Sequence, residues 1–147
     1  MSIDFTLTKL IVADVEKLER FYLALGFKTV ERRFGDKMTG YGDVAQEQSR
    51  LSTTGEATTH QLVLARFINF SAPGPGPAYP GPYWLVLRTS NVDASVDAAV
   101  RAGGRIARPA EDVKDPQHPK HDNFRAAIVC DPENNFIELY GLRSGEP

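Results

Sequence analysis

Hydrophobic positions recur at helical spacing in two stretches of the chain, one in each half. The apolar positions of the first stretch are Val15, Leu18, Phe21, Tyr22 and Leu25. Asp14 is placed to cap this helix and Gly26 to end it. The apolar positions of the second stretch are Val92, Val96, Ala99 and Val100. Asn91 and Gly103 provide its cap and its end, so the pattern predicts one helix in each half.

Alternating or β-branched runs predict four strands in each half of the chain. Those of the first half are Phe5 to Val12, Phe27 to Phe34, Ser49 to Thr54 and Gln61 to Phe67. Those of the second half are Tyr83 to Thr89, Arg105 to Pro109, Phe124 to Cys130 and Asn135 to Tyr140. With the helices in place, each half has the order β-α-β-β-β.

The two halves form an internal repeat. The cap Asp14 and the stop Gly26 are 12 residues apart, as are Asn91 and Gly103, so the units superpose at an offset of 77 (91 minus 14). Tandem units of this kind define a fold. We predict a single α+β domain over residues 1–147, with module 1 at about 3–68, a Pro/Gly linker at 69–82 and module 2 at about 83–142.

Each module offers a four-stranded sheet and only one helix, which can cover one face. The uncovered faces must meet each other or a partner, and in doing so they can enclose a cavity. We therefore predict a cup-shaped mixed sheet around a small-molecule pocket. The modules can pair within one chain or swap between the chains of a homodimer, and the homodimer is the expected assembly.

Composition narrows the class of protein. The chain has 147 residues, 41% of them hydrophobic, and a net charge of -2. The absence of basic excess argues against nucleic acid and anionic membranes as partners. The single cysteine, Cys130, cannot form an intramolecular disulfide, and its apolar neighbours indicate a small buried side chain rather than a nucleophile. No signal peptide or membrane span is evident, so a cytoplasmic protein is expected.

One carboxylate stands out in the last predicted strand. Asp131-Pro132 followed by two asparagines indicates a tight turn. In the strand after it, Phe136, Glu138 and Tyr140 share one face, while the residues between them share the other. The apolar set suits the helix-covered face. Glu138 is thus predicted on the opposite face, where it must be solvated in a pocket, paired, protonated or bound to a metal.

These motifs together resemble the vicinal oxygen chelate superfamily, which includes glyoxalase I, extradiol dioxygenases, fosfomycin resistance enzymes and bleomycin-binding resistance proteins. The segments that carry the resemblance are residues 12–17, 21–22, 25–27, 91–94, 102–104 and 131–139. The resemblance covers nearly the whole chain and implies two βαβββ modules. It marks a fold and not a reaction.

In metal-dependent members of this superfamily, the ligands come from the first and last strand of each module. Carried over to this chain, these positions are Leu7, Trp84 (7 plus 77), Glu138 and Val63, the last from aligning Arg50 with Arg125. Leu, Val and Trp cannot bind a divalent ion, and one carboxylate does not hold one tightly. No cofactor is therefore expected, and a divalent metal remains possible only with Glu138 as a ligand.

Two functions are compatible with the replacement of ligands at three of the four metal-binding positions. The first is a small-molecule binding protein of the sequestration or resistance type, without the superfamily's metal site. The alternative is a lyase, isomerase or dioxygenase-like enzyme resembling glyoxalase I, with Glu138 as metal ligand or general base.

Pocket-facing alternation gives a candidate ligand-binding set. Its members are Trp84, Arg88, Lys9, Gln61, Phe136 and Tyr140. The aromatic members would stack on a planar or aromatic ligand, and a cationic member would take an anionic group. The alternative is that Lys9 and Arg88 only extend their charges to solvent at strand ends and that Glu138 pairs with one of them.

The histidines and loops have plainer interpretations. His60 is expected as a polar strand-edge residue, and His118 and His121 as parts of a solvated loop that binds Ni or Zn at most occasionally, since Pro119 prevents a helical pair. The linker is expected to be a tether; the alternative is a flap that closes Tyr79 over the pocket. The loop from Glu111 to Asn123 is the other candidate for a pocket mouth.

Overall fold

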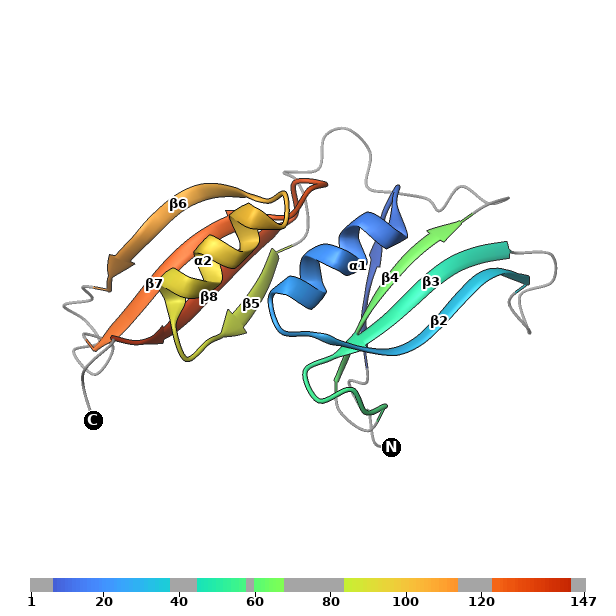
Figure 1. Cartoon of the computed structure of the whole chain (residues 1–147), viewed down its shortest axis with the longest axis horizontal. Coiled ribbons are helices and arrows are strands. Elements are labelled where there is room, and N and C mark those ends of the chain that lie inside the picture. Colours follow the sequence, from blue (N-terminus) through green and yellow to red (C-terminus); the bar gives the residue numbers. More distant parts are fainter. Residues whose placement is uncertain (1–6, 38–44, 58–59, 68–83, 114–122, 144–147) are drawn as a thin grey trace, which may run out of the picture. The chain divides into compact units, whose positions relative to one another are not determined.

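The computed structural model describes residues 7–37, 45–57, 60–67, 84–113 and 123–143 (Figure 1). The chain divides into two compact units, Met1–Gly81 and Pro82–Pro147. The predicted Pro/Gly linker, Tyr79 and the pair His118 and His121 lie outside the described residues.

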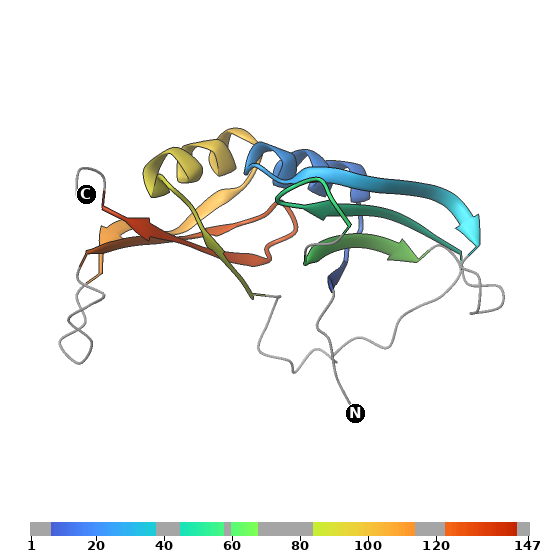
Figure 2. The same ribbon diagram turned by 90° about the horizontal axis from the view of Figure 1, so that it is seen from below.

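The first unit has five elements. They are β1 (Leu7–Ile11), α1 (Val15–Ala24), β2 (Lys28–Lys37), β3 (Ala45–Ser52) and β4 (Gln61–Phe67). The strands form one sheet in the order β1-β4-β3-β2, in which β1 runs parallel to β4 and the other neighbours are antiparallel. Helix α1 lies on one face of this sheet (Figure 2).

The second unit repeats this plan. Its elements are β5 (Trp84–Arg88), α2 (Val92–Arg101), β6 (Arg105–Asp112), β7 (Phe124–Cys130) and β8 (Phe136–Leu142). The strand order is β5-β8-β7-β6, again with one parallel pair, β5 with β8, and one helix on one face. The predicted tandem β-α-β-β-β modules of an α+β fold are confirmed.

Both helices begin and end where the sequence places their caps. Asp14 accepts a hydrogen bond from Lys17 N at 2.9 Å, and Asn91 accepts one from Ala94 N at 3.0 Å. Gly26 and Gly103 follow the helices with φ of 104° and 93°, a conformation that glycine adopts without strain. Neither of these helices, the two in the described part of the chain, is long and apolar enough to cross a membrane.

Four strands, β2, β3, β6 and β8, are longer than the pattern predicts. The polar start of β3, from Ala45, lies before the predicted strand Ser49 to Thr54, yet it pairs with β2 on one side and β4 on the other. Strand β6 continues past Pro109 to Asp112. Proline lacks an N–H and is tolerated because β6 lies at the edge of its sheet and shifts register between Arg108 and Glu111.

The core of each unit lies between the sheet and its helix. The fully buried side chains of the first unit include Leu10, Leu18, Phe21, Tyr22, Leu51 and Leu64. Those of the second unit include Ala99, Val129 and Ile137, with Val92 and Leu139 nearly as deeply buried. Strand β8 passes close to the end of β5 at Gly141, where a Cβ would lie 2.2 Å from Thr89 O. Only glycine fits there, so the β5–β8 pairing depends on it.

A charged pair of one buried and one exposed residue joins α1 to its sheet. Glu19 on α1 is 3% exposed and accepts hydrogen bonds from Arg32 on β2, one of them from Arg32 Nε at 2.9 Å. Burial alone would raise the pKa of Glu19, but its hydrogen bonds with Arg32 and the positive charge of Arg32 help to outweigh burial and hold this pKa below its ordinary value. The carboxylate therefore ties helix α1 to strand β2.

Replacing Glu19 with Gln removes this charge from a buried site and is expected to cost about 1–3 kcal/mol of stability at pH 7. Because the folded pKa is depressed, the contribution is present above the unfolded pKa of about 4.3 and is lost as the pH falls through the folded pKa. Urea unfolding of wild type and Glu19→Gln from pH 7 to pH 3 measures the gap, which should close in acid.

The matched control is Glu16→Gln, one turn earlier on α1 and exposed, for which we expect a change within about 0.5 kcal/mol. A gap for Glu19→Gln that is the same at pH 7 and pH 3 would show that the charge of Glu19 does not stabilise the fold.

Candidate functional site

A buried turn positions the last strand of the second unit. Asp131 is 2% exposed, and its carboxylate accepts hydrogen bonds from Glu133 N at 2.8 Å, Asn135 N at 3.0 Å and Asn135 Nδ2 at 2.8 Å. Asn134 has a φ of 66°, the left-handed conformation that asparagine tolerates. This geometry fixes where β8 begins and therefore which of its side chains share a face.

The predicted faces of β8 are confirmed. Ile137 and Leu139 are buried, 0% and 2% exposed, and Gly141 on the same face lies against Val92 of α2. Glu138 lies on the opposite face, between Val86 of β5 and Ile128 of β7 in the sheet register. On the sheet face that α2 leaves uncovered, Glu138 thus has an apolar neighbour on each of the two adjoining strands.

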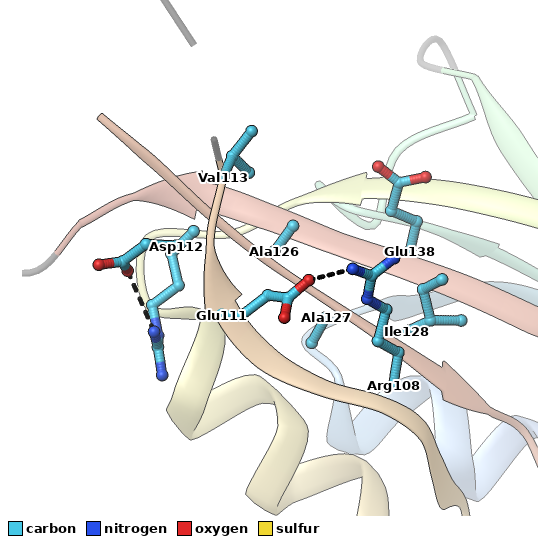
Figure 3. A pocket seen from close by; sticks show the side chains of 9 residues that line it. Arg108, Glu111, Asp112, Val113, Ala126, Ala127, Ile128 and Glu138 are labelled. Atoms are coloured by element: carbon cyan, nitrogen blue, oxygen red, sulfur yellow. Dashed lines mark hydrogen bonds and ion pairs between the residues drawn. The ribbon is translucent and has the colours of Figure 1, made fainter. Parts of the chain in front are cut away.

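Glu138 lines two adjacent hollows of the second unit. The larger, of about 690 Å³, is lined by Arg108, Glu111, Asp112, Val113, Arg125, Ala126, Ala127, Ile128 and Glu138 (Figure 3). The smaller, of about 360 Å³, is lined by Val86, Val113, Phe124, Ala126, Glu138 and Tyr140. The smaller hollow is the more aromatic, because the rings of Phe124 and Tyr140 meet edge to face at 5.9 Å. Glu138 is therefore the charged residue shared by both.

The other charges of the larger hollow are paired with one another. Arg108 bonds to Glu111 on β6, as Figure 3 shows, and Arg125 bonds to Asp112 at 3.1 Å and to Asp93 of α2 at 2.9 Å. Within the described ranges, Glu138 has no ion pair with any of these arginines or with Arg88. Its carboxylate is thus open to accept hydrogen bonds or a proton from a ligand in either hollow.

The predicted ligand-binding residues divide between the two units. Arg88 and Tyr140 are opposite each other in the β5–β8 register, two residues further along their strands than Val86 and Glu138. Arg88 is exposed. Trp84 is opposite Phe136 on the same strands. Tyr140 lines the smaller hollow.

Lys9 and Gln61 belong to the first unit, where they lie on β1 and β4. Gln61 is 7% exposed, and its Nε2 donates to Ala57 O at 3.1 Å. Burial, followed by the positive charge of Arg50, lowers the pKa of Lys9. Lys9 is therefore a partly buried cation and not a charge that extends freely into solvent.

The register places the four positions that correspond to metal ligands in the vicinal oxygen chelate superfamily. Lys9 is opposite Val63 in the first unit, and Val86 is opposite Glu138 in the second. Lys9 and Val86 are equivalent residues, because they are separated by the repeat offset of 77. Val63 is therefore the counterpart of Glu138. The alignment of Arg50 with Arg125 is wrong: Val63 pairs with Arg50 and Glu138 with Ile128, so Ile128 is the counterpart of Arg50. The loop before β4, residues 53–60, is three residues longer than the loop before β8, residues 131–135.

The side chains of the described residues do not fit a divalent metal. Leu7 and Val63 provide no ligand atom at their positions, and Glu138 is one carboxylate between apolar neighbours. No group of three or more His, Cys, Asp and Glu side chains suited to a metal occurs in the part of the chain that the structure covers. His60 is an exposed residue just before β4, hydrogen-bonded to Thr8 at 3.0 Å, as its strand-edge interpretation predicts.

Cys130 is buried, as predicted, and burial raises the pKa of its thiol. Sequence reasoning missed Arg108 and Ala126 as lining residues. Glu111 is expected in a loop at the pocket mouth but lies on β6, because the strand continues past its predicted end at Pro109. The signal that could have placed Glu111 on a strand is that an edge strand can continue through proline.

The fold and the site define a class of protein: paired βαβββ modules in which one face of each sheet has no helix and carries the polar candidates. The chain belongs to the Glyoxalase/Bleomycin resistance protein/Dioxygenase superfamily, whose family model matches residues 2–139. The expectation drawn from the sequence motifs is thereby confirmed. No curated protein matches the chain significantly.

Solved structures share the fold at low sequence identity. A glyoxalase family protein from Bacillus cereus is similar with a TM-score of 0.72 and 15% identity over 97% of this chain and 95% of that one. TioX from Micromonospora sp. ML1 has a TM-score of 0.62 and 16% identity, over 95% and 99% of the two chains. A glyoxalase I mutant from Zea mays has a TM-score of 0.68 and 24% identity over 92% of this chain, but only 46% of the maize chain is covered.

Replacing Asp131 with Ala leaves two backbone N–H groups and the buried Asn135 amide without their acceptor, so we expect a loss of about 2–4 kcal/mol in the free energy of unfolding. Denaturant unfolding measures this loss. The control is Asn134→Gly, which keeps the left-handed conformation and should change stability by less than about 1 kcal/mol. Equal effects of the two substitutions would contradict the role given to Asp131.

Proposed function

We propose that this chain is a small-molecule binding protein of its superfamily that works without the superfamily's metal site, in a sequestration or resistance role. The observation that carries the proposal is the set of side chains at the four ligand positions: Leu7, Val63 and Trp84 stand with Glu138. Three of these cannot coordinate a divalent ion, and one carboxylate does not hold one tightly.

The hollows beside Glu138 support the binding role. Volumes of about 690 and 360 Å³ are in the range of small-molecule sites. The smaller has the ring of Tyr140 at its wall and an apolar lining on most sides, which suits a planar or aromatic ligand. Glu138 would orient that ligand by accepting a hydrogen bond.

An enzyme with Glu138 as general base is the second candidate. It is favoured by the unpaired state of Glu138 among the described residues, because a base must be free to take a proton from a ligand. A binding protein and an enzyme make different demands on this residue, and the Glu138 variant described below separates them. The homodimer and the cytoplasmic location stay predictions from the sequence and the family.

Elemental analysis of protein purified without a His-tag tests the metal-free proposal. We expect no stoichiometric metal and no change in melting temperature on adding Mn, Ni, Zn or Fe, since a ligand stabilises only a protein that binds it. The untagged chain is needed because a tag binds Ni and Zn itself. A rise in melting temperature that a chelator reverses would overturn the metal-free proposal and favour the enzyme.

Glu138→Gln keeps the shape of the side chain and removes its charge. Planar aromatic compounds are first screened by the fluorescence of Trp84, the single tryptophan of the chain. If Glu138 orients the ligand, the affinity of the variant for a screened compound should fall about tenfold, as expected for the loss of a charge-assisted hydrogen bond.

Asp97→Asn is the matched control, because Asp97 is an exposed carboxylate on α2, which covers the opposite face of the same sheet. This variant should bind like wild type. The contrary outcome is that Glu138→Gln binds a compound with unchanged affinity but no longer converts it, although the wild type does. Glu138 would then be the base, and the enzyme hypothesis would replace the binding hypothesis.

A further inference from the structure

A second set of charges lies on the face of the first sheet that α1 leaves uncovered. In the register, Lys9 pairs with Val63, Val63 with Arg50, and Arg50 with Glu31. The four residues thus form one row across β1, β4, β3 and β2, with their side chains on one face. Lys9 and Arg50 flank Val63, about 10 Å apart between Cα atoms at ordinary strand spacing, and their long side chains can reach the same point above it.

The two cations are poorly neutralised by the carboxylate of their row. Glu31 accepts a hydrogen bond from Arg33 Nε at 2.9 Å and lies 4.0 Å from Arg50 Nε, so its charge is shared between two arginines. Lys9 has no ion-pair partner among the described residues. Counting the described side chains alone, the region around Val63 therefore carries an excess of positive charge.

Two buried polar atoms nearby lack a hydrogen-bond partner. They are Arg50 Nε, a donor, and Gln61 Oε1, an acceptor. The orientation of the Gln61 amide is fixed by its nitrogen, because Nε2 donates a hydrogen bond to Ala57 O. Buried polar atoms in native proteins nearly always have a partner, which can be a water or a ligand. A bound molecule with an acceptor for Arg50 Nε and a donor for Gln61 Oε1 would satisfy both atoms.

The pKa of Lys9 is consistent with a role in binding an anion. Burial, and after it the charge of Arg50, lowers the pKa of Lys9. Both causes disfavour the ammonium form in the protein without a ligand, and an anion beside Lys9 would act in the opposite direction.

We propose that this face of the first module binds the anionic group of a small organic ligand, with Lys9 and Arg50 holding its carboxylate and Gln61 Oε1 accepting a hydrogen bond from a hydroxyl or N–H group of the same molecule. The inference rests on the proposed small-molecule function and adds the chemical class of the ligand, a carboxylate with a neighbouring hydrogen-bond donor. Arg50 is suited to this role because a guanidinium matches the geometry of a carboxylate.

Calorimetric titration with three matched probes tests the proposal. Benzoate offers the carboxylate, salicylate offers the carboxylate with a neighbouring hydroxyl, and benzamide is neutral and of similar shape. We expect salicylate to bind more tightly than benzoate, and benzamide to bind at least tenfold more weakly than benzoate because it cannot pair with the two cations.

Lys9→Gln and Arg50→Gln should each weaken benzoate binding about tenfold and leave benzamide unchanged. Arg66→Gln is the matched control. Arg66 is on β4 at a position of the opposite face to Val63, where it is paired with Glu47 at 2.9 Å, and its variant should bind benzoate like wild type. Thermal unfolding of all three variants checks that they remain folded.

The titration of Lys9, followed by NMR of isotope-labelled lysine side chains, gives a readout that does not depend on the variants. Saturating salicylate should raise the pKa of Lys9 by about one unit, since a tenfold preference for the charged form equals one unit. If sulfate alone shifts this pKa and no organic anion does, the face holds an adventitious ion only and the proposal is wrong.

The remaining outcomes separate this inference from the proposed function. Equal binding of benzoate and benzamide, unaffected by Arg50→Gln, would overturn the anion site and leave a small-molecule binding protein. Failure of all three organic probes to bind, together with a Lys9 pKa that none of them shifts, would overturn the anion site. If the aromatic screen by Trp84 fluorescence were also negative, the proposed function would fail with it.

Discussion

The structure depends on the fact that each four-stranded sheet has a single ten-residue helix, which covers one of its two faces. The helix-covered faces take large apolar side chains such as Leu10, Leu64, Val129 and Ile137, while Val63 and Ala65 are buried on the other face of the first sheet. On the other faces the same strands place Glu138 in one unit and Lys9 with Arg50 in the other. The alternation of the strands, and not any motif, therefore decides on which face of its sheet each of these three charges lies.

The two modules have kept their backbone plan and exchanged their chemistry. Corresponding positions across the uncovered faces hold Lys9, Val63 and Arg50 in the first unit and Val86, Glu138 and Ile128 in the second. A cationic pair around an apolar centre thus corresponds to an acidic centre between apolar neighbours. The repeat thus provides equivalent positions on two sheets, and the residues at these positions carry opposite charge.

The sequence predicted the parts of the fold that local chemistry decides. Asp14 and Asn91 cap the helices, and Asn134 turns the chain before β8, because these side chains act on their own backbone. It failed where pairing partners decide, as in the continuation of β6 past Pro109. The candidate site shows the same division. The face of Glu138 followed from alternation, whereas the ion pair of Arg108 and Glu111 required a register shift that no local pattern reveals.

In the metal-free function that we propose, the charges of the first sheet take the part that a metal ion has in metal-dependent members of the superfamily. A metal ion would supply positive charge to an anionic ligand and act as its Lewis acid. Leu7 and Val63, at two of the corresponding positions, have no side-chain atom that binds a metal. Lys9 and Arg50, on either side of Val63, would supply the positive charge as fixed side-chain cations. Two side-chain cations can bind an oxyanion but cannot accept its electron pairs as a metal does, so under this proposal the first sheet recognises a ligand and does not activate it.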